Sequence, residues 1–315
     1  MRIFANPNYN FIKWRWHALI LSISLIWAGV ASMYVRGGLP LGIDFSGGTA
    51  LVLKFDHPVS EDVVRKALDP VTSDKVVQKY DDPRLNEILV RLPMMKGQEQ
   101  GANLDAGVNQ VTEALQRAGI GNFRVVSKDL VGPIVGEDLR TKGIYATLFA
   151  LGGILVYVAF RFRFTFAVGA IVAAFHDILI TLVFLSWFHY DLSLNVIAAI
   201  LTITGYSVND TIVVFDRVRE NQRLMRREPL DQIVNKSVNQ TLGRTVITSG
   251  CTLLAVLALY VFGGEVLRGF AFTMLVGVIT GTYSTVFIAA AIAIILSRRP
   301  PSQAVVASQA RVKRA

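Results

Sequence analysis

Six long apolar stretches constrain this chain more than any other feature of its sequence. They lie at about residues 17–35, 143–160, 165–187, 194–215, 245–262 and 270–296. A helix needs roughly 20 mostly apolar residues to cross the hydrocarbon core of a bilayer. Only 17% of the residues are charged, whereas ordinary soluble domains carry about 25%. The sequence therefore predicts an α-helical polytopic membrane protein with six transmembrane helices.

Basic residues in the connections indicate how the spans are oriented. The segments rich in Lys and Arg are residues 1–16, 161–163, 216–244 and 298–315. The short connections near His189 and Glu265 hold only Arg268. We therefore expect a cytoplasmic N-terminus at 1–16, a cytoplasmic connection at 216–244 and a disordered cytoplasmic tail at 298–315. Because topology explains the net charge of +9, no nucleic-acid partner is expected.

The first span, residues 17–35, has an alternative interpretation as a cleaved signal peptide. The apolar region of a signal peptide is usually about 7–15 residues long. This stretch is longer, and no clear small-x-small cleavage site follows it. We therefore expect a transmembrane helix at 17–35 and a five-helix bundle at 143–297. Both interpretations place residues 36–142 outside the cytoplasm.

The external segment, residues 36–142, has the mixed composition of a folded domain. Strands are predicted at 48–55, 75–80, 88–92 and 123–130, and helices at 60–68 and 104–118. This βαββαβ order favours a ferredoxin-like α+β sandwich. The segment contains no Cys/His cluster, no G-x-G-x-x-G loop and no nucleophile elbow. We therefore expect a docking or substrate-contacting module without a metal or catalytic residues.

Two ionisable residues near the fourth and fifth spans are candidates for ion coupling, because charges inside a bilayer are costly and by default mark ion or proton pathways. Asp210 lies in the fourth span, and Arg244 opens the fifth. An alternative is that Asp210 only joins neighbouring helices and that Arg244 is a flanking charge. The polar residues expected to support the pair, several of them on one face at helical spacing, are Tyr206, Ser207, Asn209 and Thr248.

A second polar position lies near the middle of the third span, at His176 and Asp177. A structural polar network is the favoured interpretation of these two residues. Adjacent residues of a helix do not face each other, so we expect the two side chains to contact different neighbours. In the sixth span, Gly277 and Gly281 are spaced by one helical turn, which indicates close helix packing.

Several motifs give the chain a resemblance to a known family. They are GIDFSGGT at 42–49, DLVGPIVGEDL at 129–139, GYSVNDTIVVFDRVRE at 205–220, NQTLGRTVIT at 239–248 and GFAFTMLVGVITGTYSTVFI at 269–288. In these segments the chain resembles the SecF family, the smaller subunits of the bacterial SecD–SecF pair in the resistance–nodulation–division superfamily. The residues that carry the motifs near the external domain are Gly42, Asp44, Gly47, Gly48, Gly132, Pro133 and Gly136.

The resemblance implies a role in protein export across the bacterial inner membrane. It implies a periplasmic external domain, and SecD, the SecYEG channel and an unfolded secretory polypeptide as partners. By motif position, the proton-coupling Asp of the family falls on Asp210 and its functional Arg on Arg244. No cofactor and no enzymatic activity are implied; H⁺ is the expected coupling ion, and Na⁺ stays an alternative.

Three other functions stay open on the sequence alone. A half-transporter exporting drugs or lipids would need a second external domain, and only one is present. An intramembrane protease would need Asp177 and Asp210 to share a proton. The third is a scaffold of the export channel that moves no protons.

Overall fold

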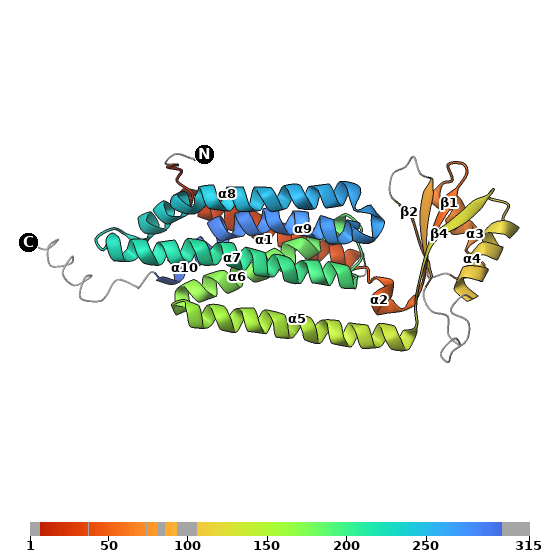
Figure 1. Ribbon diagram of the computed structural model, residues 1–315, viewed down its shortest axis with the longest axis horizontal. Helices are drawn as coiled ribbons and strands as arrows, with labels where there is room; N and C mark the ends of the chain where they lie inside the picture. The colour runs from red at the N-terminus through yellow and green to blue at the C-terminus, as the bar shows by residue number, and fades with distance from the viewer. Residues whose placement is uncertain (1–6, 37, 73–74, 81–85, 93–105, 298–315) are drawn as a thin grey trace, which may run out of the picture.

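The computed structural model describes residues 7–36, 38–72, 75–80, 86–92 and 106–297. It consists of a long helical bundle and a small α+β domain at one end of it, as Figure 1 shows. The predicted tail at 298–315 and the beginning of the predicted N-terminal segment lie outside the described residues.

The helices of the bundle come from both sides of the domain in the sequence. They are the 3-10 turn η1 (Ile12–Trp14), α1 (Arg15–Val35), α5 (Pro133–Arg161), α6 (Phe164–Trp187), α7 (Leu194–Leu224), α8 (Leu230–Phe262), α9 (Gly264–Ser284), the π-helical turn η3 (Thr285–Ala289) and α10 (Ala290–Ser297). Six helices among the described residues are long and apolar enough to cross a membrane, the last of them running from α9 through η3 to α10. The prediction of six spans is therefore confirmed.

The α+β domain follows α1 and a short helix, α2 (Ile43–Ser46). Its elements are β1 (Gly48–Phe55), α3 (Glu61–Ala67), β2 (Val76–Tyr80), β3 (Glu87–Leu92), α4 (Ala106–Arg117) and β4 (Phe123–Val131). They form an antiparallel sheet of four strands in the order β2-β3-β1-β4, so the predicted βαββαβ order is confirmed. Alternate residues of β1, Leu51 and Leu53, are buried in one core with Val111 and Leu115 of α4.

Helix α9 is the central element of the bundle, and it packs against α6, α7 and α8. Glycines allow its close approach to α7. A Cβ atom on Gly277 would overlap the side chain of Ile203, and one on Gly281 would lie 3.0 Å from Cβ of Ser207. The close packing predicted for these two glycines is confirmed.

Helices α7 and α8 continue beyond their apolar stretches, so the segment 216–244 is largely helical (Figure 1). The two extensions lie at the end of the bundle that is opposite the α+β domain. Asn221 of α7 is buried there and donates to Ser237 Oγ and Gln240 Oε1 of α8, each at 2.8 Å. These side-chain bonds join the two extensions beside a small apolar contact of Val218 with Ile233 and Val234.

A salt bridge joins the α+β domain to the bundle. Arg91 of β3 pairs with Asp191, which lies in the connection between α6 and α7, and the two side chains are 14% and 16% exposed. Burial raises the pKa of the Asp191 carboxyl above its ordinary value, while the hydrogen bond and the charge of Arg91 oppose that rise. The domain is therefore fixed to the end of the bundle by a largely desolvated ion pair.

Gly277→Ala is expected to lower the stability of the bundle by about 1–3 kcal/mol, because overpacking forces neighbouring side chains to move. Thermal unfolding of the purified chain in detergent measures the effect. Gly153→Ala in α5 is the matched control, since a Cβ there meets nothing within 4 Å. Equal unfolding temperatures for the two variants would contradict the packing described for α9.

Arg91→Met is expected to free the α6–α7 connection, because removing one partner of a buried ion pair costs about 3–5 kcal/mol. Hydrogen exchange of residues 188–193 should become faster while the exchange of α9 stays unchanged. Arg117→Met is the control within the same domain: its pair with Glu113 is 79% and 61% exposed, and such surface pairs contribute only about 0–1 kcal/mol. If the two variants exchange alike, the salt bridge does not fix the domain.

Candidate functional site

Asp210 lies in the part of α7 that is buried within the bundle, with 8% of its surface exposed. Its Oδ1 accepts a hydrogen bond of 2.8 Å from Thr245 Oγ1 of α8. Its Oδ2 is buried and has no hydrogen-bond partner among the described residues. Because an unsatisfied buried polar atom is costly, this oxygen marks a position where a proton or a cation would be stabilised.

Arg244, the predicted partner of Asp210, precedes Thr245 on α8 and is exposed. Its positive charge acts on the Asp210 carboxylate through space. Within the described residues, however, no salt bridge of 4.0 Å or less joins the two side chains. Arg244 therefore lies next to the carboxylate site in the chain, and its neighbour Thr245 is the residue that contacts the Asp210 carboxylate.

The residues expected to support the pair have separate environments. Tyr206 donates to Ser249 Oγ of α8 over 3.4 Å, and Thr282 of α9 donates to the same oxygen over 2.9 Å. Thr248 is exposed, and its hydroxyl donates to the carbonyl oxygen of Arg244 in its own helix. Asn209 is exposed on the surface of α7. The predicted polar stripe is thus divided: Tyr206 bonds α8, Ser207 bonds Asp177 of α6, and Asn209 and Thr248 lie on the surface of the bundle.

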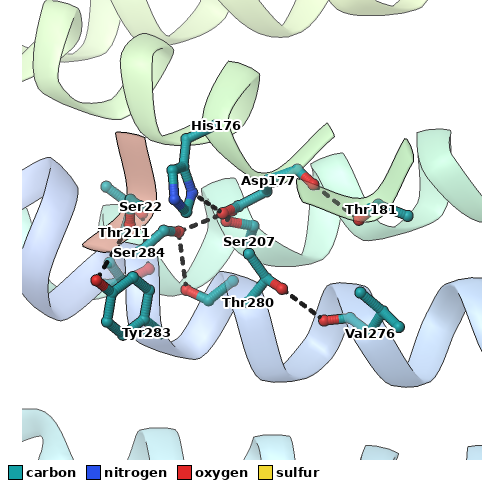
Figure 2. A network of polar contacts seen from close by, with 12 residues as sticks. Ser22, His176, Asp177, Thr181, Ser207, Thr211, Val276, Thr280, Tyr283 and Ser284 are labelled. Atoms are coloured by element: carbon teal, nitrogen blue, oxygen red, sulfur yellow. Dashed lines mark hydrogen bonds and ion pairs between the residues drawn. The ribbon is translucent and has the colours of Figure 1, made fainter. Parts of the chain in front are cut away.

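A second buried polar centre surrounds Asp177 of α6, which is fully buried (Figure 2). Ser207 of α7 and Ser284 of α9 donate to its Oδ2 over 2.5 and 2.8 Å. His176 Nδ1 lies 2.9 Å from its Oδ1. The expectation that His176 and Asp177 contact different neighbours is therefore wrong. The side chains meet each other, and beyond that contact Asp177 is bonded from α7 and α9 while the His176 ring lies 6.1 Å from the ring of Tyr283 of α9.

Asp177 and Asp210 do not form an acid pair in the described structure. The Asp177 carboxylate is bonded by His176, Ser207 and Ser284, whereas the Asp210 carboxylate is bonded by Thr245. The proton sharing that an aspartyl protease requires is therefore missing from this arrangement. Among the residues that the structure describes, no group of three or more His, Cys, Asp or Glu is placed to hold a metal ion.

The motif residues that follow α1 lie where the α+β domain meets α7. Asp44 Oδ2 accepts the backbone N–H of Leu194, the first residue of α7, over 2.9 Å. The N–H of Gly42 donates to the carbonyl of Leu192, whose own N–H donates to Pro40, each over 2.8 Å. A carboxylate at the N-terminus of a helix satisfies an unpaired N–H and interacts favourably with the helix dipole. The motif therefore caps the helix that carries Asp210.

Glycines of the motifs at 42–49 and 129–139 permit a sharp backbone turn before β1 and a close approach of α5 to that turn. Gly47 and Gly48 have φ values of +66° and +122°, which side chains with a Cβ rarely adopt. A Cβ on Gly136 of α5 would lie 3.2 Å from the backbone nitrogen of Gly47. Gly132 is the N-cap of α5 and Pro133 its first residue, a position that suits proline. The two motifs together thus join β1 to the beginnings of α5 and α7.

Several residues around Asp210 and Asp177 were not predicted from the sequence. They are Thr245, Ser249, Thr282 and Ser284, and the pair Arg91–Asp191 at the junction with the α+β domain was not predicted either. The sequence does contain one signal: hydroxyl residues are dense around 280–285 in an otherwise apolar span. Which hydroxyls reach another helix depends on how the helices are rotated, and that rotation is a tertiary property.

Comparison with known families and proteins identifies the chain. The family described as protein export membrane protein SecD/SecF, C-terminal, matches residues 110–299, and the SecD/SecF GG motif matches residues 32–59. Protein translocase subunit SecF of Rhodothermus marinus is 42% identical over 311 residues, which cover 95% of this chain and 96% of that protein. The SecF of Escherichia coli O157:H7 is 41% identical over 292 residues, which cover 92% and 88%.

Solved structures agree with these relatives. The crystal structure of SecDF, a translocon-associated membrane protein from Thermus thermophilus, superposes with a TM-score of 0.81 at 37% identity, covering 93% of this chain. A second SecDF structure, in a super-membrane-facing form, gives a TM-score of 0.68 at 36% identity. This chain spans 39% and 41% of the lengths of those two chains. Its sequence, its topology and these likenesses together show that the chain belongs to the SecF family of protein translocase subunits.

Proposed function

We propose that this chain is an accessory subunit of the Sec protein-export machinery that uses the proton gradient to promote the late, outward movement of secretory polypeptides. Membership of the SecF family, whose relatives are named as translocase subunits, supports the export role. The proton-dependent step rests on one observation: Asp210 is a buried carboxylate with one oxygen bonded by Thr245 and the other without a partner in the described chain.

The chemistry of the step follows from this geometry. A charged carboxylate inside an apolar bundle is stabilised either by a proton or by an opposite charge. Asp210 Oδ2 accepts the proton in one state. In the other state the exposed guanidinium of Arg244 approaches the deprotonated carboxylate, since Arg244 is adjacent to Thr245 on α8. Alternation between the protonated and deprotonated states changes how α7 and α8 pack against each other.

Helix α7 provides the connection from this step to the external domain. Its first backbone N–H is bonded by Asp44, and the preceding connection is held to the sheet by Arg91 and Asp191. A shift of α7 would therefore act on the α+β domain through both contacts. In this proposal the domain lies in the periplasm, both termini are cytoplasmic, and the domain holds the emerging unfolded polypeptide.

The partners of the proposal are SecD and the SecYEG channel. The similar solved structures are of SecDF, and this chain accounts for about two fifths of their length. The exposed polar side chains Asn209, Arg244 and Thr248 of α7 and α8 suit contact with a second helical bundle better than contact with lipid. The coupling ion is H⁺ in this proposal. Na⁺ is the alternative, and replacing the proton gradient by a sodium gradient tests it.

Export from sealed inverted membrane vesicles that contain the assembled complex tests the proposal. Asp210→Asn and Arg244→Met are each expected to reduce polypeptide release in the presence of a proton gradient to the level without the gradient. Glu220→Gln removes a carboxylate from the exposed end of the same helix and should keep the full gradient effect. If gradient-dependent release persists in both site variants, the chain is a scaffold of the export channel.

Asp44→Ala is expected to separate proton binding from movement of the domain, because it removes the acceptor of the Leu194 N–H while Ser193, the N-cap residue of α7, still accepts from Val196. Gradient-dependent release should fall while complex assembly is maintained. Asp44→Asn keeps an oxygen acceptor for the Leu194 N–H and is expected to restore most of the release. Equal loss in the two variants would show that the charge of Asp44, rather than the cap, is what matters.

A further inference from the structure

Four consecutive residues near the end of α9 each bond a different neighbouring helix. The residues are Thr282, Tyr283, Ser284 and Thr285. In that order, their partners are Ser249 of α8, Ala18 of α1, Asp177 of α6 and Thr211 of α7. The π-helical turn η3 begins at Thr285, and such turns are frequent at functional sites. This segment of α9 therefore links the surrounding helices through one stretch of chain.

Only one of these four contacts involves an ionisable pair. Asp177 is fully buried, and His176 is 7% exposed. His176 Nδ1 lies 2.9 Å from Asp177 Oδ1, and His176 Nε2 is buried without a hydrogen-bond partner among the described residues. A neutral imidazole beside a carboxylate carries one net negative charge. One added proton makes the pair neutral, which a buried apolar site favours.

Other ionisable groups near the pair are few. The phenol ring of Tyr283 lies 6.1 Å from the imidazole ring, and its hydroxyl bonds Ala18 and Ser22 of α1. Asp210 of α7 is one turn from Ser207 but bonds Thr245 of α8. The charged residues of α1, α5 and α9, the other long helices that pack on α6, lie toward the helix ends, and η3 and α10 have none. No cation in the described bundle therefore neutralises Asp177 directly.

We propose that His176 and Asp177 form a second proton-binding site of the bundle, and that Ser284 transmits its occupancy to α9. With the carboxylate deprotonated, the hydroxyls of Ser207 and Ser284 both donate to Asp177 Oδ2. A proton taken up from water by that oxygen makes it an O–H donor to Ser284 Oγ, so the hydroxyl hydrogen of Ser284 must turn to another acceptor while Ser207 keeps donating to Oδ2. Ser284 has one in its own helix, the carbonyl of Gly281 at 3.2 Å.

Proton uptake therefore reverses the bond between Asp177 of α6 and Ser284 of α9 and turns the Ser284 hydroxyl toward the carbonyl of Gly281 inside α9. A Cβ on Gly281 would lie 3.0 Å from Cβ of Ser207 of α7, so the changed bond is at a close contact between α9 and α7. Release of the proton to water restores the original direction of the bond. The site goes beyond the proposed function, because it operates whether or not Asp210 carries protons.

Infrared difference spectroscopy of the purified chain between a neutral and an acidic solution tests the site. The C=O stretch reports a protonated buried carboxylic acid, and ¹⁵N spectra of the labelled imidazole report a proton on His176. A C=O band that appears on acidification is expected in the wild type and in Asp210→Asn, and its loss is expected in Asp177→Asn. A wild type without that band, including one in which only the imidazole takes up the proton, would overturn the proposal.

Two further variants keep the test decisive if Asp177→Asn does not fold. Ser284→Ala removes one hydrogen bond to Oδ2 and is expected to shift the C=O band. Thr280→Val is the matched control, since Thr280 donates only to the carbonyl of Val276 within α9 (Figure 2) and its replacement should leave the band in place. Identical bands in both variants would show that Ser284 does not sense the proton. Loss of export in Asp210→Asn with the Asp177 signal intact separates this site from the proposed function.

Discussion

The structure of the bundle depends on one constraint: a polar group inside an apolar bilayer must find its partner within the protein. Most hydroxyls meet it locally by donating to the carbonyl four residues earlier, as Thr204 and Thr280 do. A few instead reach another helix, and they gather around Asp177 and Asp210. Some of the bonds between helices thus end on the two buried carboxylates, where a change of protonation changes the contacts between helices.

Helix α7 connects these centres to the external domain. It carries Asp210, its Ser207 donates a hydrogen bond to Asp177, and its first backbone N–H is bonded by Asp44 of the GIDFSGGT motif. The close approach of α9 through Gly277 and Gly281 leaves little room for independent movement of the two helices. A rigid, closely packed bundle of this kind transmits a local change over a distance, because packed interfaces move between discrete arrangements rather than deform continuously.

Much of this architecture could be predicted from the sequence, because it depends on local patterns. Apolar length determines the spans, and alternating strand and helix patterns determine the βαββαβ order. The exceptions concern tertiary contacts. Tyr206, Ser207 and Asp210 are near one another on α7, yet Tyr206 and Asp210 bond Ser249 and Thr245 of α8 while Ser207 bonds Asp177 of α6. Helical spacing indicates a shared face, but only the rotation and the neighbours of the helix decide each partner.

The most direct test of the central claim is proton flux into sealed liposomes that contain this chain assembled with its SecD partner. A pH-sensitive dye inside the liposomes reports the flux after the external solution is acidified. Because Asp210 Oδ2 is a buried carboxylate oxygen without a partner among the described residues, the account predicts flux in the wild-type complex and its loss in Asp210→Asn. Equal flux in the two complexes would contradict the account, because Asp210 would then not be the residue that carries the proton.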